Sequence, residues 1–89
     1  MARTLLVGAE IACPTTVGAA TSFGGAQVVR LVNTNGSAQK VTVLEEQSGA
    51  GIGSMTMPAG SVEFLEKKST EVVLAASADV LGTKVGYTA

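Results

Sequence analysis

The chain has 89 residues, which is the length of one small domain. It is 46% hydrophobic but only 3% aromatic and 15% charged, so few bulky side chains are available to build a core. The net charge of −1 and the six scattered basic residues argue against nucleic-acid binding and against docking to an anionic membrane. Because the core is small and the surface carries little charge, we expect the chain to gain stability by associating with copies of itself.

Residues 1–25 are rich in glycine, alanine and threonine and show little regular alternation. The apolar patches at 5–7 and 11–12 predict one or two short strands within an arm or loop-rich lead-in. We expect no signal peptide, because the first apolar run stops at Glu10, and no membrane span, because no window approaches about 20 apolar residues. Cys13 has no second cysteine to pair with and no histidine to activate it, so we expect a small buried hydrophobic residue.

A hairpin is predicted where two alternating segments flank a turn sequence. Residues 27–33 and 40–45 are the expected strands, and Val41 and Val43 share one face of the second strand. Between them lies Asn35–Gly36, which tolerates the positive φ of a hairpin turn. The overlapping glycosylation sequon, Asn35–Ser37, is explained by the same turn.

The middle of the chain continues the strand pattern. A flexible loop is expected at 47–53, followed by a strand at 54–57 in which Met55 and Met57 share a face. These methionines are interpreted as core filling, with a partner-facing stripe as the alternative. Pro58–Gly60 predicts a tight turn.

The last third predicts three further strands. In 61–67, Val62 and Phe64 are expected on the buried face, opposite Glu63 and Lys67. The other elements are a short strand at 71–74, a loop or single helical turn at 75–82, and a closing strand at 83–88 in which Thr83, Val85 and Tyr87 share a face.

Together these elements predict an all-β fold: a small antiparallel β-sandwich or barrel-like meander or Greek key of about seven short strands. Residues 1–25 form its Gly/Ala-rich N-terminal arm, residues 26–89 form the sandwich domain, and the whole is one domain.

No catalytic, cofactor-binding or metal-binding residue is predicted, and the protein is not expected to be an enzyme. Without histidine, a Ser-His-Asp triad is impossible. The glycine-rich segment 49–54 lacks both the dinucleotide-binding glycine spacing and a Gly-Lys-Ser/Thr sequence, and no helix is expected after it. The paired carboxylates, Glu45/Glu46 and Glu63/Glu66, are interpreted as solvated strand residues.

One family resemblance emerges from the order of these segments. It rests on Asn33-Thr34-Asn35-Gly36, Val41-Thr42-Val43, the run from Gly53 to Lys67 (GSMTMPAGSVEFLEK), Val72-Val73-Leu74, and Gly82-Thr83-Lys84-Val85-Gly86-Tyr87-Thr88. Over about residues 27–88 the chain resembles the small β-sandwich virion proteins of tailed bacteriophages, especially those that decorate or cement the capsid. The resemblance implies many identical copies, grouped as trimers, bound to a major capsid protein.

The expected function is therefore non-enzymatic: a capsid decoration or cement protein of a phage virion, assembled in the host cytoplasm. Residues 1–25 are expected to reach a neighbouring subunit as a swapped strand, so deletion of residues 2–25 should abolish oligomerisation. The alternatives are a tail, neck or fibre component of the virion, or a ligand-binding β-module. A sugar-binding module needs exposed aromatic platforms, for which only Tyr87 qualifies.

Overall fold

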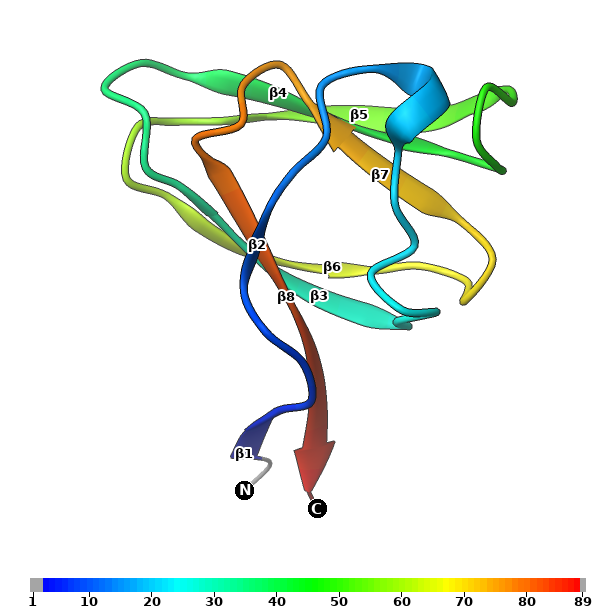
Figure 1. Cartoon of the computed structure of the whole chain (residues 1–89). Coiled ribbons are helices and arrows are strands. Elements are labelled where there is room, and N and C mark those ends of the chain that lie inside the picture. Colours follow the sequence, from blue (N-terminus) through cyan, green and yellow to red (C-terminus); the bar gives the residue numbers. More distant parts are fainter. Residues whose placement is uncertain (1–2, 89) are drawn as a thin grey trace.

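The protein is a β-sandwich made of two antiparallel sheets (Figure 1). A computed structural model describes the backbone of residues 3–88 and the side chains of residues 4–86. One sheet has five strands, with the path β1-β8-β3-β6 and β2 paired to β8, and the other has three in the order β5-β4-β7. The predicted all-β sandwich is confirmed.

The strands are short, and their positions follow the apolar alternation of the sequence. Their bounds are β1 (Arg3–Leu6), β2 (Ile11–Ala12), β3 (Val28–Asn33), β4 (Gln39–Leu44), β5 (Gly51–Met57), β6 (Val62–Glu66), β7 (Val72–Ala75) and β8 (Val80–Thr88). A single 3-10 turn, η1 (Val17–Ala19), is the helical element of the described residues. No helix within residues 3–88 is long and apolar enough to cross a membrane.

The starts of two strands differ from the prediction. β5 already begins at Gly51, inside the segment 47–53 expected to be a loop. The segment 76–79 is a loop, which was one of the two predicted alternatives, but β8 already begins at Val80, so Gly82 lies within that strand. Thr83 and Val85 are both buried on β8, as their shared face predicts, whereas the side chain of Tyr87 lies outside the described ones.

The predicted hairpin between 27–33 and 40–45 is wrong. β3 pairs with β6 and β8, whereas β4 pairs with β5 and β7 in the opposite sheet. The connection between them crosses from one sheet to the other (Figure 1), and neither Asn35 nor Gly36 has the positive φ of a two-residue hairpin turn. The apolar and polar alternation of a strand shows which of its residues share a face. It does not show with which other strand it pairs.

The crossing between the sheets is organised by Asn33, whose side chain is fully buried. Its amide nitrogen donates to the carbonyls of Ser37 (3.0 Å), Met57 (2.9 Å) and Pro58 (3.3 Å). Its Oδ1 accepts from the backbone N–H of Asn35 at 2.9 Å. One side chain thus satisfies backbone carbonyls just before β4 and at the end of β5.

The predicted turn at Pro58–Gly60 is present at the second crossing. The backbone N–H of Ser61 donates to the carbonyl of Pro58 at 3.0 Å, and Gly60 has a φ of 75°. A positive φ at the third residue of such a turn favours glycine. The N–H of Gly60 also donates to the carbonyl of Asn33 at 2.9 Å, which ties this turn to the end of β3.

The core lies between the sheets and is closed at one point by an aromatic ring over a glycine. Phe23 has a φ of 54°, in the left-handed region, and its N–H donates to the Thr21 hydroxyl at 3.1 Å. A Cβ placed on Gly82 would lie 2.5 Å from the Phe23 ring and 3.2 Å from Leu31. Gly82 therefore lets the ring approach the backbone of β8.

Replacement of Gly82 by alanine is expected to lower the free energy of unfolding by about 1–3 kcal/mol, because Phe23 must move within a packed core. Urea denaturation measures the change. Gly36→Ala is the matched control, since a Cβ at Gly36 meets no atom within 4 Å and its φ is not positive, and it should be neutral or slightly stabilising. Equal stability of the two alanine variants would contradict this packing.

The N-terminal region divides into two parts. Residues 13–25 lie against the sandwich, where Cys13, Ala20 and Phe23 are buried. Thr21 and Val73 exchange backbone hydrogen bonds of 3.1 and 2.8 Å, so this segment covers the outer edge of β7. The prediction that Cys13 is buried is confirmed, and burial raises the pKa of its thiol to about 11.

Candidate interaction surface

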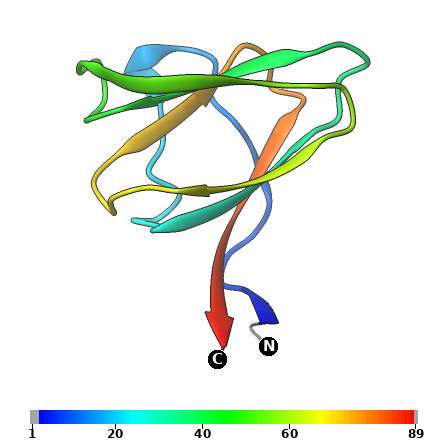
Figure 2. The same cartoon turned by 180° about the vertical axis from the view of Figure 1, so that it is seen from behind.

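The arm, which we define as residues 3–9, projects from the sandwich together with the end of β8 (Figures 1 and 2). Within it, Leu5 pairs with Gly86 and Leu6 with Val85. The exposed fractions of Leu5, Leu6 and Val7 are 46%, 75% and 53%. Three consecutive exposed aliphatic residues on a projecting ribbon form an apolar surface of the kind that contacts partners.

The base of the arm is held by several weak contacts. The backbone N–H of Val7 donates to the carbonyl of Lys84 at 3.0 Å, and that of Cys13 donates to the carbonyl of Val80 at 2.8 Å. Glu10 and Arg30 form an ion pair of 3.9 Å between partly exposed side chains, which contributes little to stability. These contacts set the direction in which the arm leaves the sandwich.

A second apolar surface lies on the outer face of β6, and here the predicted face of the strand is wrong. Val62 and Phe64 were expected to be buried, but their exposed fractions are 41% and 49%. Leu65 is the partly buried residue packed against the core, and it pairs with the buried Val29 of β3. Lys67, expected on the wet face, is buried.

Lys67 is accommodated because its charge meets backbone carbonyls. The side chain is 6% exposed, and Nζ donates to the carbonyls of Ala26 (2.7 Å) and Lys68 (3.2 Å). Burial lowers the pKa of Lys67; the Glu71 carboxylate opposes this shift and Lys84 adds to it. The lysine thus fastens the end of β6 to the start of β3.

The stabilising contribution of Lys67 is expected to rise with pH. Its folded-state pKa lies below the unfolded value of 10.5, so the unfolded chain binds more protons between the two values and stability increases with pH through that window. Urea unfolding of the wild type and Lys67→Met, from about pH 8 to about pH 11, measures the difference.

The raised pKa of Cys13 acts in the opposite direction, since its contribution is lost as pH rises from 9.0 toward about 11. It is common to both proteins and cancels in their difference. Lys40→Met, at an exposed position of β4, serves as the control for the removal of a lysine charge. A wild-type advantage over Lys67→Met that stays constant with pH would contradict the assignment.

A groove of about 250 Å³ opens between β5 and β6, which are edge strands of the two sheets. Its lining residues are Val41, Val43, Ile52, Gly53, Ser54, Met55, Leu65, Glu66 and Glu71. Its floor is the apolar core, and both of its charged residues are acidic. The core interpretation of the methionines is confirmed for Met57, which is 1% exposed, and Met55 packs partly buried against the same cluster.

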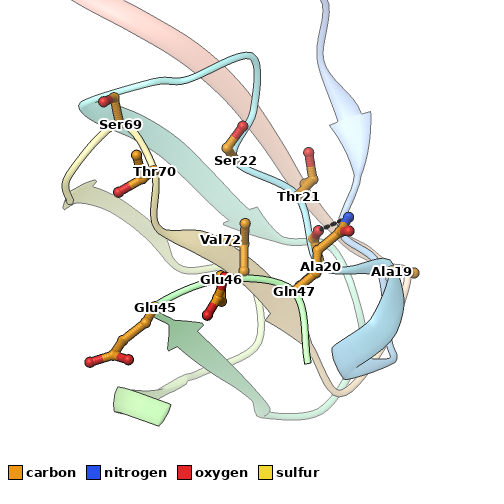
Figure 3. Close-up of a pocket in the computed structure, with 10 residues that line it drawn as sticks. All are labelled: Ala19, Ala20, Thr21, Ser22, Glu45, Glu46, Gln47, Ser69, Thr70 and Val72. Carbon is orange, nitrogen blue, oxygen red and sulfur yellow. Dashed lines mark hydrogen bonds between the residues drawn. The ribbon is translucent and has the colours of Figure 1, made fainter. Parts of the chain in front are cut away.

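A larger, more polar depression of about 910 Å³ lies beside η1 (Figure 3). Hydroxyl groups from the segments 21–22 and 69–70 line one side, and Glu45 and Glu46 lie on the other. Gln47 donates to the carbonyl of Ala20 at 3.0 Å and closes one end. No aromatic residue lines this depression among the described residues.

The carboxylate pairs are exposed, as predicted. On β6, Glu63 pairs with Leu31 and Glu66 pairs with Val28, so the two point to opposite faces. Among the described residues, no three or more acidic or cysteine side chains gather in a way that could hold a metal ion. The glycine-rich segment 49–54 leads into β5 and not into a helix.

The interaction surface was predicted only in part. The arm follows from the sequence, whereas the exposed face of β6 and the groove depend on pairings that the sequence leaves open. No family model matches the chain, and its comparison with curated proteins and with solved structures gives no match either.

Proposed function

We propose that the protein is a non-enzymatic structural protein of a phage virion, a decoration or cement protein that stabilises the capsid shell through subunit contacts. The observation that carries the proposal is the projecting arm, whose aliphatic residues Leu5, Leu6 and Val7 stay exposed although the sandwich already has a closed core. An isolated small protein gains nothing from such an arm, whereas a repeating assembly can bury it in every copy.

Two separate surfaces support this role. The arm faces away from the sandwich and is suited to contact a neighbouring copy, while Val62 and Phe64 form an apolar patch on the outer face of the larger sheet. We assign the patch to the major capsid protein. A protein that contacts both its own copies and the shell opposes expansion by many small contacts that must break together.

The experiment is co-sedimentation of the purified protein with shells assembled from the major capsid protein of the same virus. Saturable binding and a higher temperature of shell disassembly are the expected results. Phe64→Glu should weaken binding, and Val17→Glu, at a similarly exposed position on η1, is the matched control. Absence of binding by the wild type would contradict the decoration role and favour a tail, neck or fibre component.

A ligand-binding module is the second candidate, and the polar depression beside η1 favours it. Hydroxyl and carboxylate groups can bind a polyol or sugar, but the lining holds no aromatic platform among its described residues. Calorimetric titration with simple saccharides separates the two functions. Saturable sugar binding that Glu46→Gln abolishes would favour the module.

A further inference from the structure

We propose that the groove between β5 and β6 binds the arm of a second copy of this chain, so that aliphatic side chains of residues 5–7 fill the space beside Gly53. The inference rests on the proposed self-associating role and names the surface through which the copies join. Each copy would insert its own arm into the groove of one neighbour and bind the arm of another neighbour in its own groove.

The two sides of the sandwich differ in how their strand edges are protected. On one side, Thr21 covers the outer edge of β7 through two backbone hydrogen bonds with Val73. On the other side, β5 and β6 each end a sheet, with no further strand beside them in the described part of the chain. Such edges present backbone donors and acceptors to which an incoming extended segment can pair.

The groove exists because an inward position on β5 lacks a side chain. Gly53 pairs with Val43, which is 9% exposed, so the two residues point to the same, core-facing side. A Cβ added at Gly53 meets no atom within 4 Å. The groove, at about 250 Å³, exceeds the roughly 150 Å³ apolar cavity that accommodates benzene, so an aliphatic side chain from outside can fill it.

The arm of another copy matches this groove in apolar character and in charge. The arm of the same chain is paired to the end of β8, which points away from the sandwich (Figure 2). Residues 1–9 carry one basic and no acidic residue, whereas the charged residues of the groove are Glu66 and Glu71. A head-to-tail contact of this kind closes into a ring when its rotation allows, and a trimer is such a ring.

The first test fills the groove from within. Gly53→Val places a side chain in the empty space and is expected to weaken self-association about 100-fold, because the side chains from the arm lose their binding site. The variant should still fold, because a Cβ at Gly53 meets no atom within 4 Å. Thr56→Val makes a similar change at an exposed position of the same strand outside the groove, and should associate like the wild type.

The second test identifies the contact directly. In a Cys13→Ala background, Leu6→Cys and Ile52→Cys are made in separate chains, and equal amounts are mixed under mild oxidation. Disulfide-linked dimers that form only in the mixture are expected. Dimers that form as readily from Leu6→Cys alone would show arm-to-arm pairing and overturn the proposal.

The two tests separate this inference from the proposed function. If the wild type is oligomeric and Gly53→Val has the same mass, the groove assignment is overturned while the virion role stands. If Gly53→Val keeps its mass but no longer sediments with shells, the groove binds the capsid protein, and the second-copy assignment is again overturned. A monomeric wild type overturns the inference, and shell binding then decides the virion role on its own.

Discussion

Replacement of Asn33 by aspartate is expected to lower the free energy of unfolding by about 3–5 kcal/mol. The side chain is fully buried, and its amide donates to three carbonyls, of which that of Met57 is the nearest at 2.9 Å. Aspartate has nearly the same shape, but its carboxylate cannot donate when ionised and would place a negative charge among three carbonyl oxygens. The lost hydrogen bonds are those that hold together the two connections between the sheets, from β3 to β4 and from β5 to β6.

Urea denaturation at neutral pH measures this effect, and lower pH provides a second readout. A protonated aspartate regains one donor, so part of the stability should return in acid. Asn35→Ala removes hydrogen bonds to the nearby Ser37 and Asp79, which are exposed, and should cost about 1 kcal/mol or less. If Asn33→Ser and Asn33→Asp are both as stable as Asn35→Ala, the central role of Asn33 is wrong.

Replacement of Leu6 by aspartate is expected to convert the assembled protein into an 8.9 kDa monomer that remains folded. Leu6 is 75% exposed in the single chain, so its removal leaves the core intact. Burial of a leucine at an interface contributes about 1.5–3 kcal/mol, and a carboxylate there adds a cost of desolvation. Light scattering on a sizing column gives the mass, and thermal unfolding gives the stability.

Val17→Asp is the matched control, because Val17 is a 51% exposed aliphatic residue on η1, outside the arm. It should assemble like the wild type. Deletion of residues 2–25 does not isolate the role of the arm, since it also removes the buried Cys13 and Phe23. Deletion of residues 2–9 removes the arm alone. If the Leu6→Asp protein assembles like the wild type, the arm does not mediate self-association.

The positions of the strands could be predicted from alternation, but their partners could not. Val41 and Val43 are buried on one face of β4, as expected, and the turn at Pro58–Gly60 is present. The hairpin of β3 and β4 failed because the residues between them serve a crossing, held by a buried asparagine. An Asn-Gly pair specifies a hairpin only when both strands belong to one sheet.

The face of β6 shows a second limit. The segment Val-Glu-Phe-Leu-Glu-Lys contains apolar residues in both phases, at Val62 and Phe64 and at Leu65. The pairing with β3 determines which set faces the core: Leu65 lies opposite the buried Val29 and therefore points inward. The burial of Lys67 depends on carbonyls brought together only by the fold.

The candidate surface was likewise visible only in part. The Gly/Ala/Thr-rich composition of residues 1–25 indicated an arm. The structure places residues 3–9 on a projecting ribbon, whereas residues 13–25 lie against the sandwich. The groove depends on Gly53 facing the core between two edge strands, which follows from register and layer order. A glycine within an alternating segment was the signal that could have pointed to it.

The most direct test of the account is the solution mass of the full chain, measured by light scattering at micromolar concentration and at a tenfold dilution. Self-association through the arm predicts a trimer or larger ring whose mass is the same at both concentrations. A mass of 8.9 kDa at both concentrations would show a stable monomer and contradict the account.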